Sequence, residues 1–163
     1  MPTQYSQFIN GGNLQAGDRI VGLRNNLNTI FNPANTDSTI QITQPAHGFV
    51  AGTFPLVYIN GAGNFVAANA ASPLTASVIG IIIQVIDVNN FILQFIGLTP
   101  TITPQVNPPI AALIPGTVYY LSDAVAGSYT AVAPVIAGHV LKPVFIAFTV
   151  TTAFIFNYQG RVL

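Results

Sequence analysis

Charged residues are scarce in this sequence, which has four basic and four acidic side chains among 163 residues. The acidic residues are all aspartates, because glutamate is absent. An ordinary soluble domain carries about 25% charged residues, whereas this chain carries 5%. A soluble monomer depends on surface charge for its solubility. We therefore expect much of the surface to be buried against other copies of the chain or within a larger assembly.

Cysteine and tryptophan are also absent. Without cysteine the chain can form no disulfide and can perform no thiol chemistry. The formal net charge is zero, which leaves no electrostatic case for binding to nucleic acid, and we expect no nucleic-acid partner. The 11 Phe and 6 Tyr residues provide large apolar side chains, of the kind that a core or an interface uses.

The mean hydropathy of +0.58 is high, yet we expect no membrane span. A span needs about 20 mostly apolar residues. The most apolar window, Val78 to Leu98, is interrupted by Gln84, Asp87 and Gln94. The first residues also lack the basic region and the apolar region of a signal peptide. We therefore expect no membrane partner.

Residues 1–37 differ in composition from the rest, because they hold half of the charges and few apolar residues. Two apolar runs, Ile20 to Arg24 and Leu27 to Phe31, flank the pair Asn25-Asn26. Asparagine tolerates positive φ, so this pattern favours a β-hairpin with a two-residue turn. A segment of this length is too small to have a core of its own. We interpret residues 1–37 as an extended attachment arm.

A helix is the alternative for the same stretch. Ile20, Leu23, Leu27 and Ile30 are spaced three, four and three residues apart, as on one face of a helix that begins near Asp18. Glycine and asparagine within the stretch lower its helix propensity, so the hairpin is the favoured prediction.

Residues 38–163 have the pattern of an all-β domain, in which short runs of β-branched and aromatic residues alternate with Gly, Pro and Asn turns. We expect an antiparallel β-sandwich or barrel. The expected strands are Thr39 to Thr43, Phe54 to Ile59, Phe65 to Ala67, Val78 to Ile86, Phe91 to Ile96, Thr117 to Leu121, Ser128 to Val132, Val140 to Val150 and Ala153 to Tyr158. Hairpin turns are expected at residues 60–64, 87–90 and 151–152, and an irregular loop with five prolines is expected from Gly97 to Pro115.

The acid–base inventory is too small for an obvious active site. It consists of four aspartates with His47 and His139, and no carboxylate or cysteine lies at metal-ligand spacing from either histidine. A catalytic site needs two or three convergent titratable groups. We therefore expect no enzyme activity, no metal and no cofactor. We interpret both histidines as turn residues bonded to backbone, and Asp123 as the cap of a turn.

Several segments of residues 46–163 together form an ordered series of glycines, turns and strands. They are His47-Gly48-Phe49 with Gly52, Asn64 to Ala68, Val78 to Ile82, Phe91 to Phe95, Pro115 to Ser122, Gly127 to Thr130 and Lys142-Pro143-Val144. This series resembles a β module of tailed-bacteriophage virion proteins, found in head-decoration proteins, head fibres and tail fibres. Phe8 to Gly12 and Gly22 to Asn25 more weakly resemble the N-terminal attachment segments of such proteins.

The resemblance implies a structural role in a virion and commonly a homotrimer. It carries no catalytic signature. This chain departs from the usual module by placing Ile, Ala or Asn where the strand faces are usually charged, which indicates unusually complete burial in an assembly. The leading hypothesis is a capsid decoration protein or a short head-fibre subunit located in the virion, with other virion proteins, among them the major capsid protein, as candidate partners.

The arm is expected to provide the attachment to those partners. Ordering each residue costs about 1–2 kcal/mol of backbone entropy, and each fully buried large apolar side chain returns roughly 1.5–3 kcal/mol, so the few apolar residues of the arm cannot offset the cost alone. Strand addition to an adjacent chain would supply the missing hydrogen bonds. The expected partner-binding residues are Phe8, Ile9, Arg19, Arg24 and Phe31.

A receptor- or glycan-binding module of a tail fibre is the alternative function. Tyr119, Tyr120, Tyr129 and Tyr158 could stack on sugar rings. Tyrosine is also a common strand residue, and a glycan site usually has several convergent polar groups beside its aromatic side chains. Packing of these tyrosines within the sheet or between subunits is therefore the favoured interpretation.

Overall fold

The computed structural model describes residues 20–24, 27–31, 38–103, 105–106, 109–156 and 158–163. The chain divides into two compact units, Met1–Thr36 and Asp37–Leu163, and each is described by itself. The described residues contain strands and turns but no helix, so the predicted all-β class is confirmed.

The described residues of the first unit form an antiparallel pair of strands, β1 (Ile20–Arg24) and β2 (Leu27–Phe31). Their register places Ile20 opposite Phe31 and Arg24 opposite Leu27. The predicted hairpin strands are therefore confirmed and the helix alternative is wrong, because the β-branched and aromatic residues pair across the strands. The turn residues Asn25 and Asn26 lie outside the described part of the chain.

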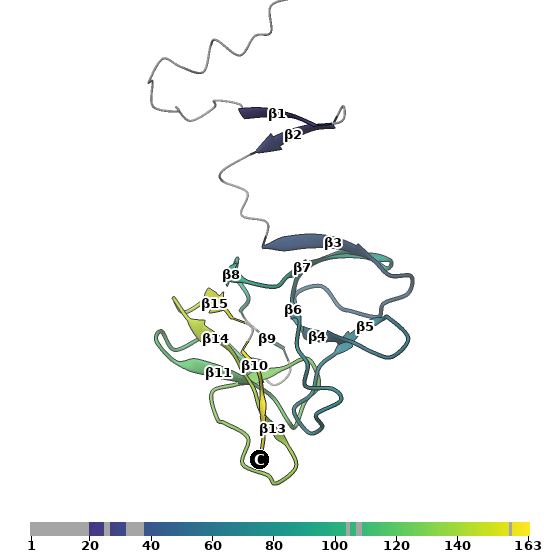
Figure 1. Cartoon of the computed structure of the whole chain (residues 1–163). Coiled ribbons are helices and arrows are strands. Elements are labelled where there is room, and N and C mark those ends of the chain that lie inside the picture. Colours follow the sequence, from purple (N-terminus) through teal and green to yellow (C-terminus); the bar gives the residue numbers. More distant parts are fainter. Residues whose placement is uncertain (1–19, 25–26, 32–37, 104, 107–108, 157) are drawn as a thin grey trace, which may run out of the picture. The chain divides into compact units, whose positions relative to one another are not determined.

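The second unit is built around two five-stranded antiparallel sheets (Figure 1). The first sheet has the order β3 (Thr39–Thr43), β7 (Asn90–Gln94), β6 (Gly80–Asp87), β4 (Leu56–Ile59) and β5 (Phe65–Ala67). The second sheet has the order β12 (Tyr129–Thr130), β11 (Val118–Leu121), β14 (Pro143–Ala147), β15 (Ala153–Ile155) and β8 (Gly97–Leu98). Two further pairs join β9 (Gln105–Val106) to β10 (Pro109–Ile110) and β13 (Val140–Leu141) to β16 (Arg161–Val162).

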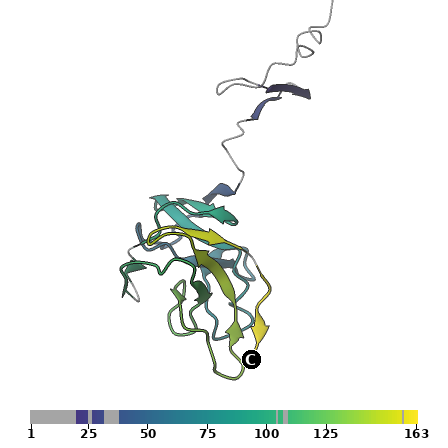
Figure 2. The ribbon, with the colours of Figure 1, turned by 90° about the vertical axis from the view of Figure 1, so that its left-hand side faces the viewer.

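The main core lies between the two sheets, as in a β-sandwich. Leu56 and Ile81 of the first sheet belong to one buried cluster with residues of β11, β12, β14 and β15. The centre of this cluster is aromatic, since Tyr119, Tyr129 and Phe145 pack with ring centroids 4.8–5.8 Å apart. Figure 2 shows the same domain turned by a quarter turn.

A second, smaller cluster lies on the first sheet and contains Val57, Ile82, Phe91 and Leu93. Phe49, from the loop after β3, packs edge-on against Phe91 with 5.3 Å between ring centroids. The first sheet is therefore apolar on both faces around the first half of β6, which explains why Ile81, Ile82 and Ile83 follow one another there without alternation.

The predicted hairpin turns at residues 60–64 and 87–90 are confirmed, and the hairpin predicted at residues 151–152 is present with a longer turn that begins at residue 148. β4 pairs with β5 across residues 60–64, β6 pairs with β7 with Asp87 opposite Asn90, and β14 pairs with β15 across residues 148–152. Several strands are shorter than expected. β4, for example, begins at Leu56 because Phe54 has a φ of 47°, which lies outside the extended region.

The expectation of an irregular loop from Gly97 to Pro115 is wrong in part. β8, β9 and β10 lie within it, and β8 forms the edge of the second sheet. β16 near the C-terminus was also not predicted. Each of these strands has two residues, which is too short to produce the period-two alternation from which a strand is read.

Candidate functional site

His47 holds a loop against the first sheet. Its Nε2 donates to the carbonyl of Asp87 at 2.8 Å, and its Nδ1 accepts from the amide of Phe49 at 2.9 Å. Both ring nitrogens are thus used by backbone groups, and the ring stacks on Phe49 at 5.2 Å between centroids. The prediction that His47 is a turn histidine bonded to backbone is confirmed.

His139 differs from that prediction. Its Nδ1 lies 3.0 Å from Oδ2 of Asp123, and both side chains are 21% exposed. This contact ties the loop after β11 to the start of β13. The turn at Asp123 is capped instead by Ser122, whose Oγ accepts from the amides of Ala124 and Val125. The capping role predicted for Asp123 is therefore wrong, because the carboxylate is used by a histidine that is distant in the sequence.

Within the part of the chain that the structure describes, the pair His139–Asp123 does not extend to a larger titratable cluster. No group of three or more His, Cys, Asp or Glu side chains that could hold a metal ion occurs among the described residues. A dyad of this kind can orient a proton, but catalysis also needs a third convergent group. The pair joins the loop after β11 to the residue that precedes β13.

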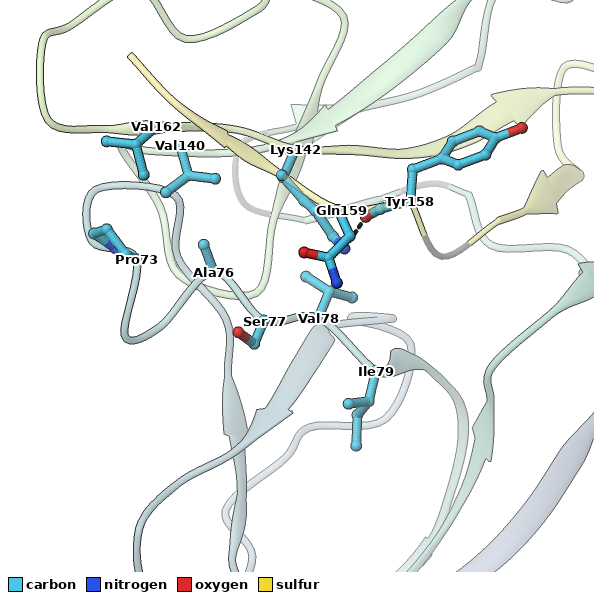
Figure 3. A pocket seen from close by; sticks show the side chains of 11 residues that line it. Pro73, Ala76, Ser77, Val78, Ile79, Val140, Lys142, Tyr158, Gln159 and Val162 are labelled. Atoms are coloured by element: carbon cyan, nitrogen blue, oxygen red, sulfur yellow. Dashed lines mark hydrogen bonds between the residues drawn. The ribbon is translucent and has the colours of Figure 1, made fainter.

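A cavity of about 320 Å³ lies beside the C-terminal segment (Figure 3). Its lining is Pro73, Ala76, Ser77, Val78, Ile79, Val140, Lys142, Tyr158, Gln159, Gly160 and Val162. Lys142 is 5% exposed, and its ammonium group donates to the carbonyl of Tyr158. Burial lowers the pKa of Lys142 below its ordinary value, because desolvation disfavours the charged form. The hydrogen bond fixes the C-terminal segment along the wall of the cavity.

A more open groove of about 440 Å³ lies against the second sheet. It is lined by Val118, Tyr120, Leu141, Pro143, Phe156, Tyr158, Gln159 and Arg161. Tyr158 is 62% exposed, and its ring packs on Phe156 with 4.7 Å between centroids. Arg161 forms no salt bridge with any described residue. The structure describes two basic side chains of the Lys and Arg type, of which Lys142 is buried and Arg161 is exposed.

The four tyrosines of the sequence analysis are separated by the fold. Tyr119 and Tyr129 are buried in the sandwich core, and the hydroxyl of Tyr129 donates to the carbonyl of Ile102 at 3.0 Å. These two cannot stack on an external ligand. Tyr120 and Tyr158 line the groove, where an external ring could reach them.

The outer face of the second sheet is apolar, which the strand pattern alone did not predict. The register places Leu98 of β8 opposite Phe154 of β15, Phe154 opposite Ile146 of β14, and Ile146 opposite Val118 of β11. Leu98, Phe154 and Ile146 are 52%, 48% and 36% exposed. We call these four side chains the apolar row. Its sequence signal is the run Ala153-Phe154-Ile155, in which the residue between two buried ones is also apolar.

The arm residues expected to bind a partner lie mostly outside the described part of the chain. Phe8, Ile9 and Arg19 fall there entirely. Arg24 is the last residue of β1 and Phe31 the last residue of β2, and the register places them at opposite ends of the hairpin. The hairpin therefore does not bring these two positions together.

Comparison of the chain with protein-family models, with curated proteins and with solved structures finds no match. Among the described residues there is no helix long and apolar enough to cross a membrane.

Proposed function

We propose that this chain is a structural protein of a tailed-bacteriophage virion, a capsid decoration protein or a short head-fibre subunit that attaches through residues 1–37. The observation that carries the proposal is the apolar row on the outer face of the second sheet. A sheet face exposed to water usually carries polar side chains. A face of exposed Leu, Phe and Ile is instead typical of a surface that is covered in an assembly.

The low charge of the chain supports the same proposal. The structure describes the side chains of two of its four aspartates, Asp87 and Asp123, and Asp123 is taken up by the contact with His139. As an isolated monomer at high concentration, a chain with so few charged residues would lack the electrostatic repulsion that keeps monomers apart. Within a virion the same surface is solubilised by the particle as a whole, so few charges are needed.

The experiment is to locate the chain in purified particles. We expect mass spectrometry of gradient-purified virions to detect it, and cryo-EM to place it on the capsid surface. A chain that lacks residues 1–37 should no longer enter particles. Full incorporation of that truncated chain would show that the arm is not the anchor, and absence of the intact chain from virions would overturn the proposal.

A matched pair of full-length variants tests the arm without truncation. Arg24→Gln lowers the charge of the arm by one, and Gln41→Glu lowers the charge of the β domain by one at an exposed position of β3 that lies outside the apolar row and the groove. We expect only the arm variant to be lost from particles. Equal loss in both would indicate a general effect of charge rather than attachment by the arm.

A glycan-binding module is the second candidate function, and the groove favours it. Tyr120, Phe156 and Tyr158 provide aromatic surface, while Gln159 and Arg161 provide polar groups at the same site, as sugar-binding sites require. Binding of host surface polysaccharides to the purified chain, measured by calorimetry, tests this candidate. Tyr158→Ala should abolish the binding, whereas Leu74→Ala, at a residue that is 85% exposed and does not line the groove, should not.

A further inference from the structure

We infer that the outer face of the second sheet is the surface through which copies of this chain associate, with the apolar row at its centre. The inference rests on the proposed assembly function, and it specifies the face and the partner. All residues of this face belong to the second unit, Asp37–Leu163, and the inference uses no residue of the arm.

The row runs across four of the five strands of the sheet. Leu98, Phe154, Ile146 and Val118 are successive cross-strand neighbours from β8 to β11. Directly opposed residues of antiparallel strands point to the same face, so their side chains form one continuous surface. The flanking residues Ala153 and Ile155 are buried in the core, which fixes the row on the outside.

The surface continues beyond the row in two directions. Phe148 follows Ile146 by two residues and is 66% exposed. At the other end Val118 also lines the groove, together with Phe156 and Tyr158. The row and the groove therefore share Val118 and form one continuous surface across the sheet, which is mainly apolar and carries Gln159 and Arg161 at the groove.

The size of this surface is suitable for a subunit contact. A fully buried aromatic side chain contributes about 150–250 Å², so the exposed parts of Phe148, Phe154 and Tyr158 together provide roughly 300 Å². Leu98 and Ile146 add to it. A typical monomer has a largest apolar patch of about 300–600 Å², and a stable interface buries about 800 Å² per partner. The patch is thus large enough for the apolar centre of an interface but smaller than a whole one, so a subunit contact through this face must also bury polar residues around it.

The chemistry of the face selects a second copy as the partner. The row carries no charge, and Arg161 is the one charged residue that lines the groove. Interface centres are enriched in aromatic residues and depleted of charge, and two such faces can meet without burying an ion. A partner with a charged contact surface would find no counter-charge on the row, and the cost of desolvating its own charge would oppose binding.

The experiment uses the full chain with a charge placed in the row and a matched charge elsewhere. Phe154→Glu changes a strand residue that is 48% exposed in the second sheet, and Ile59→Glu changes one that is 49% exposed at the end of β4 in the first sheet. Sedimentation velocity should find an oligomer for the wild type and for Ile59→Glu. Phe154→Glu should associate at least about 100-fold more weakly, because it buries an unpaired charge. A monomeric wild type, or an unchanged Phe154→Glu oligomer, would overturn the inference.

A second measurement keeps the test decisive if Phe154→Glu fails to fold. The natural chain has no cysteine, so Phe154→Cys and Ile59→Cys each introduce a single thiol. We expect maleimide to label Cys at position 154 at least about tenfold more slowly than Cys at position 59 in the oligomer, and equally fast after dilution to monomers. Slow labelling at position 154 in a monomer would mean that the arm covers the face, and protection only on addition of phosphatidylcholine vesicles would mean that lipid does. Either outcome overturns the inference.

These outcomes are distinct from failure of the proposed function. Self-association is measured on the purified chain, whereas virion location is measured on particles. A chain that oligomerises through this face but is absent from virions would retain the inference and lose the proposed function.

Discussion

Gln94 donates a hydrogen bond from Nε2 to the carbonyl of Leu98, at 2.8 Å, and so links the last residue of β7 in the first sheet to β8 in the second. The same amide nitrogen donates to the carbonyl of Ile96 at 3.2 Å. Gln94 is 1% exposed. One buried amide therefore holds the crossover between the sheets and positions Leu98, the first member of the apolar row.

Replacing Gln94 with methionine should destabilise the domain by about 0.5–1.5 kcal/mol, because the carbonyls of Ile96 and Leu98 lose a donor. The loss is no larger because methionine also removes Oε1 of Gln94, a buried oxygen with no hydrogen-bond partner among the described residues. Denaturant unfolding provides the measurement. Gln41→Met, at an exposed strand position in β3, is the matched control and should change the free energy of unfolding by less than about 0.5 kcal/mol. Equal effects of the two substitutions would contradict a bracing role for Gln94.

Gly80→Ala should destabilise the domain strongly. A Cβ on Gly80 would clash with the backbone carbonyl oxygen of Gln94 and would lie 2.9 Å from Cδ1 of Leu93. Overpacking of this kind costs about 1–3 kcal/mol or more, since β6 and β7 must separate to admit the methyl group. Thermal unfolding should show a clear fall in Tm. Gly61→Ala, where nothing lies within 4 Å of the added Cβ, should leave Tm nearly unchanged, and a similar fall there would refute the packing argument.

Asp87 should contribute an acid-sensitive part of the stability. Its carboxylate accepts from the amide of Asn89 at 2.7 Å and from the side-chain amide of Asn90 at 2.9 Å, and these bonds lower its pKa below the ordinary value of 3.8. Because the folded pKa lies below the unfolded one, the stabilisation is present above the unfolded pKa and is lost as pH falls through the folded pKa. Urea midpoints measured from neutral pH down through this range should therefore decline less steeply for Asp87→Asn. If the urea midpoints of the wild type and of Asp87→Asn fall equally with pH, the hydrogen bonds at this turn do not favour the ionised form of Asp87.

Tyr129→Phe should destabilise the core by about 0.5–1.5 kcal/mol at neutral pH, because the carbonyl of Ile102 loses its donor. Burial raises the pKa of Tyr129 far above its ordinary value of 10.0. A raised pKa gives stability that is present below the unfolded pKa and is lost as pH rises above it. Alkaline unfolding should consequently be shallower in Tyr129→Phe than in the wild type. The control Tyr158→Phe, at an exposed residue, should leave the fall of stability with rising pH unchanged. If both substitutions reduce that fall equally, Tyr129 is not the group that causes it.

The local features of the fold could be predicted from the sequence. The turns at residues 60–64 and 87–90 are predicted by their Asn and Gly residues, which favour turn conformations. The strands that flank each turn pair with one another as predicted. The period-two alternation of Thr39–Thr43 likewise fixed a strand whose bounds match the structure. These features depend on side chains within a few residues of one another, which is the range over which a pattern can be read.

The candidate site was not predictable in the same way. The contact of His139 with Asp123 joins residues that are 16 positions apart, and the apolar row joins four separate strands. Neither leaves a periodic signal. The division of the tyrosines into the buried pair Tyr119 and Tyr129 and the groove pair Tyr120 and Tyr158 also depends on which side of the sheet meets the core.

By itself the sequence determined the all-β class, the main turns and the scarcity of charge, because these depend on composition and on neighbouring residues. Only the tertiary structure decided where the apolar excess lies. In β14 and β15 the residues on both faces of the strand are apolar, so the sequence pattern cannot say which face is buried. Packing of Phe145 and Ile155 into the shared core settles that choice and leaves Ile146 and Phe154 outside, because a one-residue change of phase turns every side chain of a strand to the opposite face.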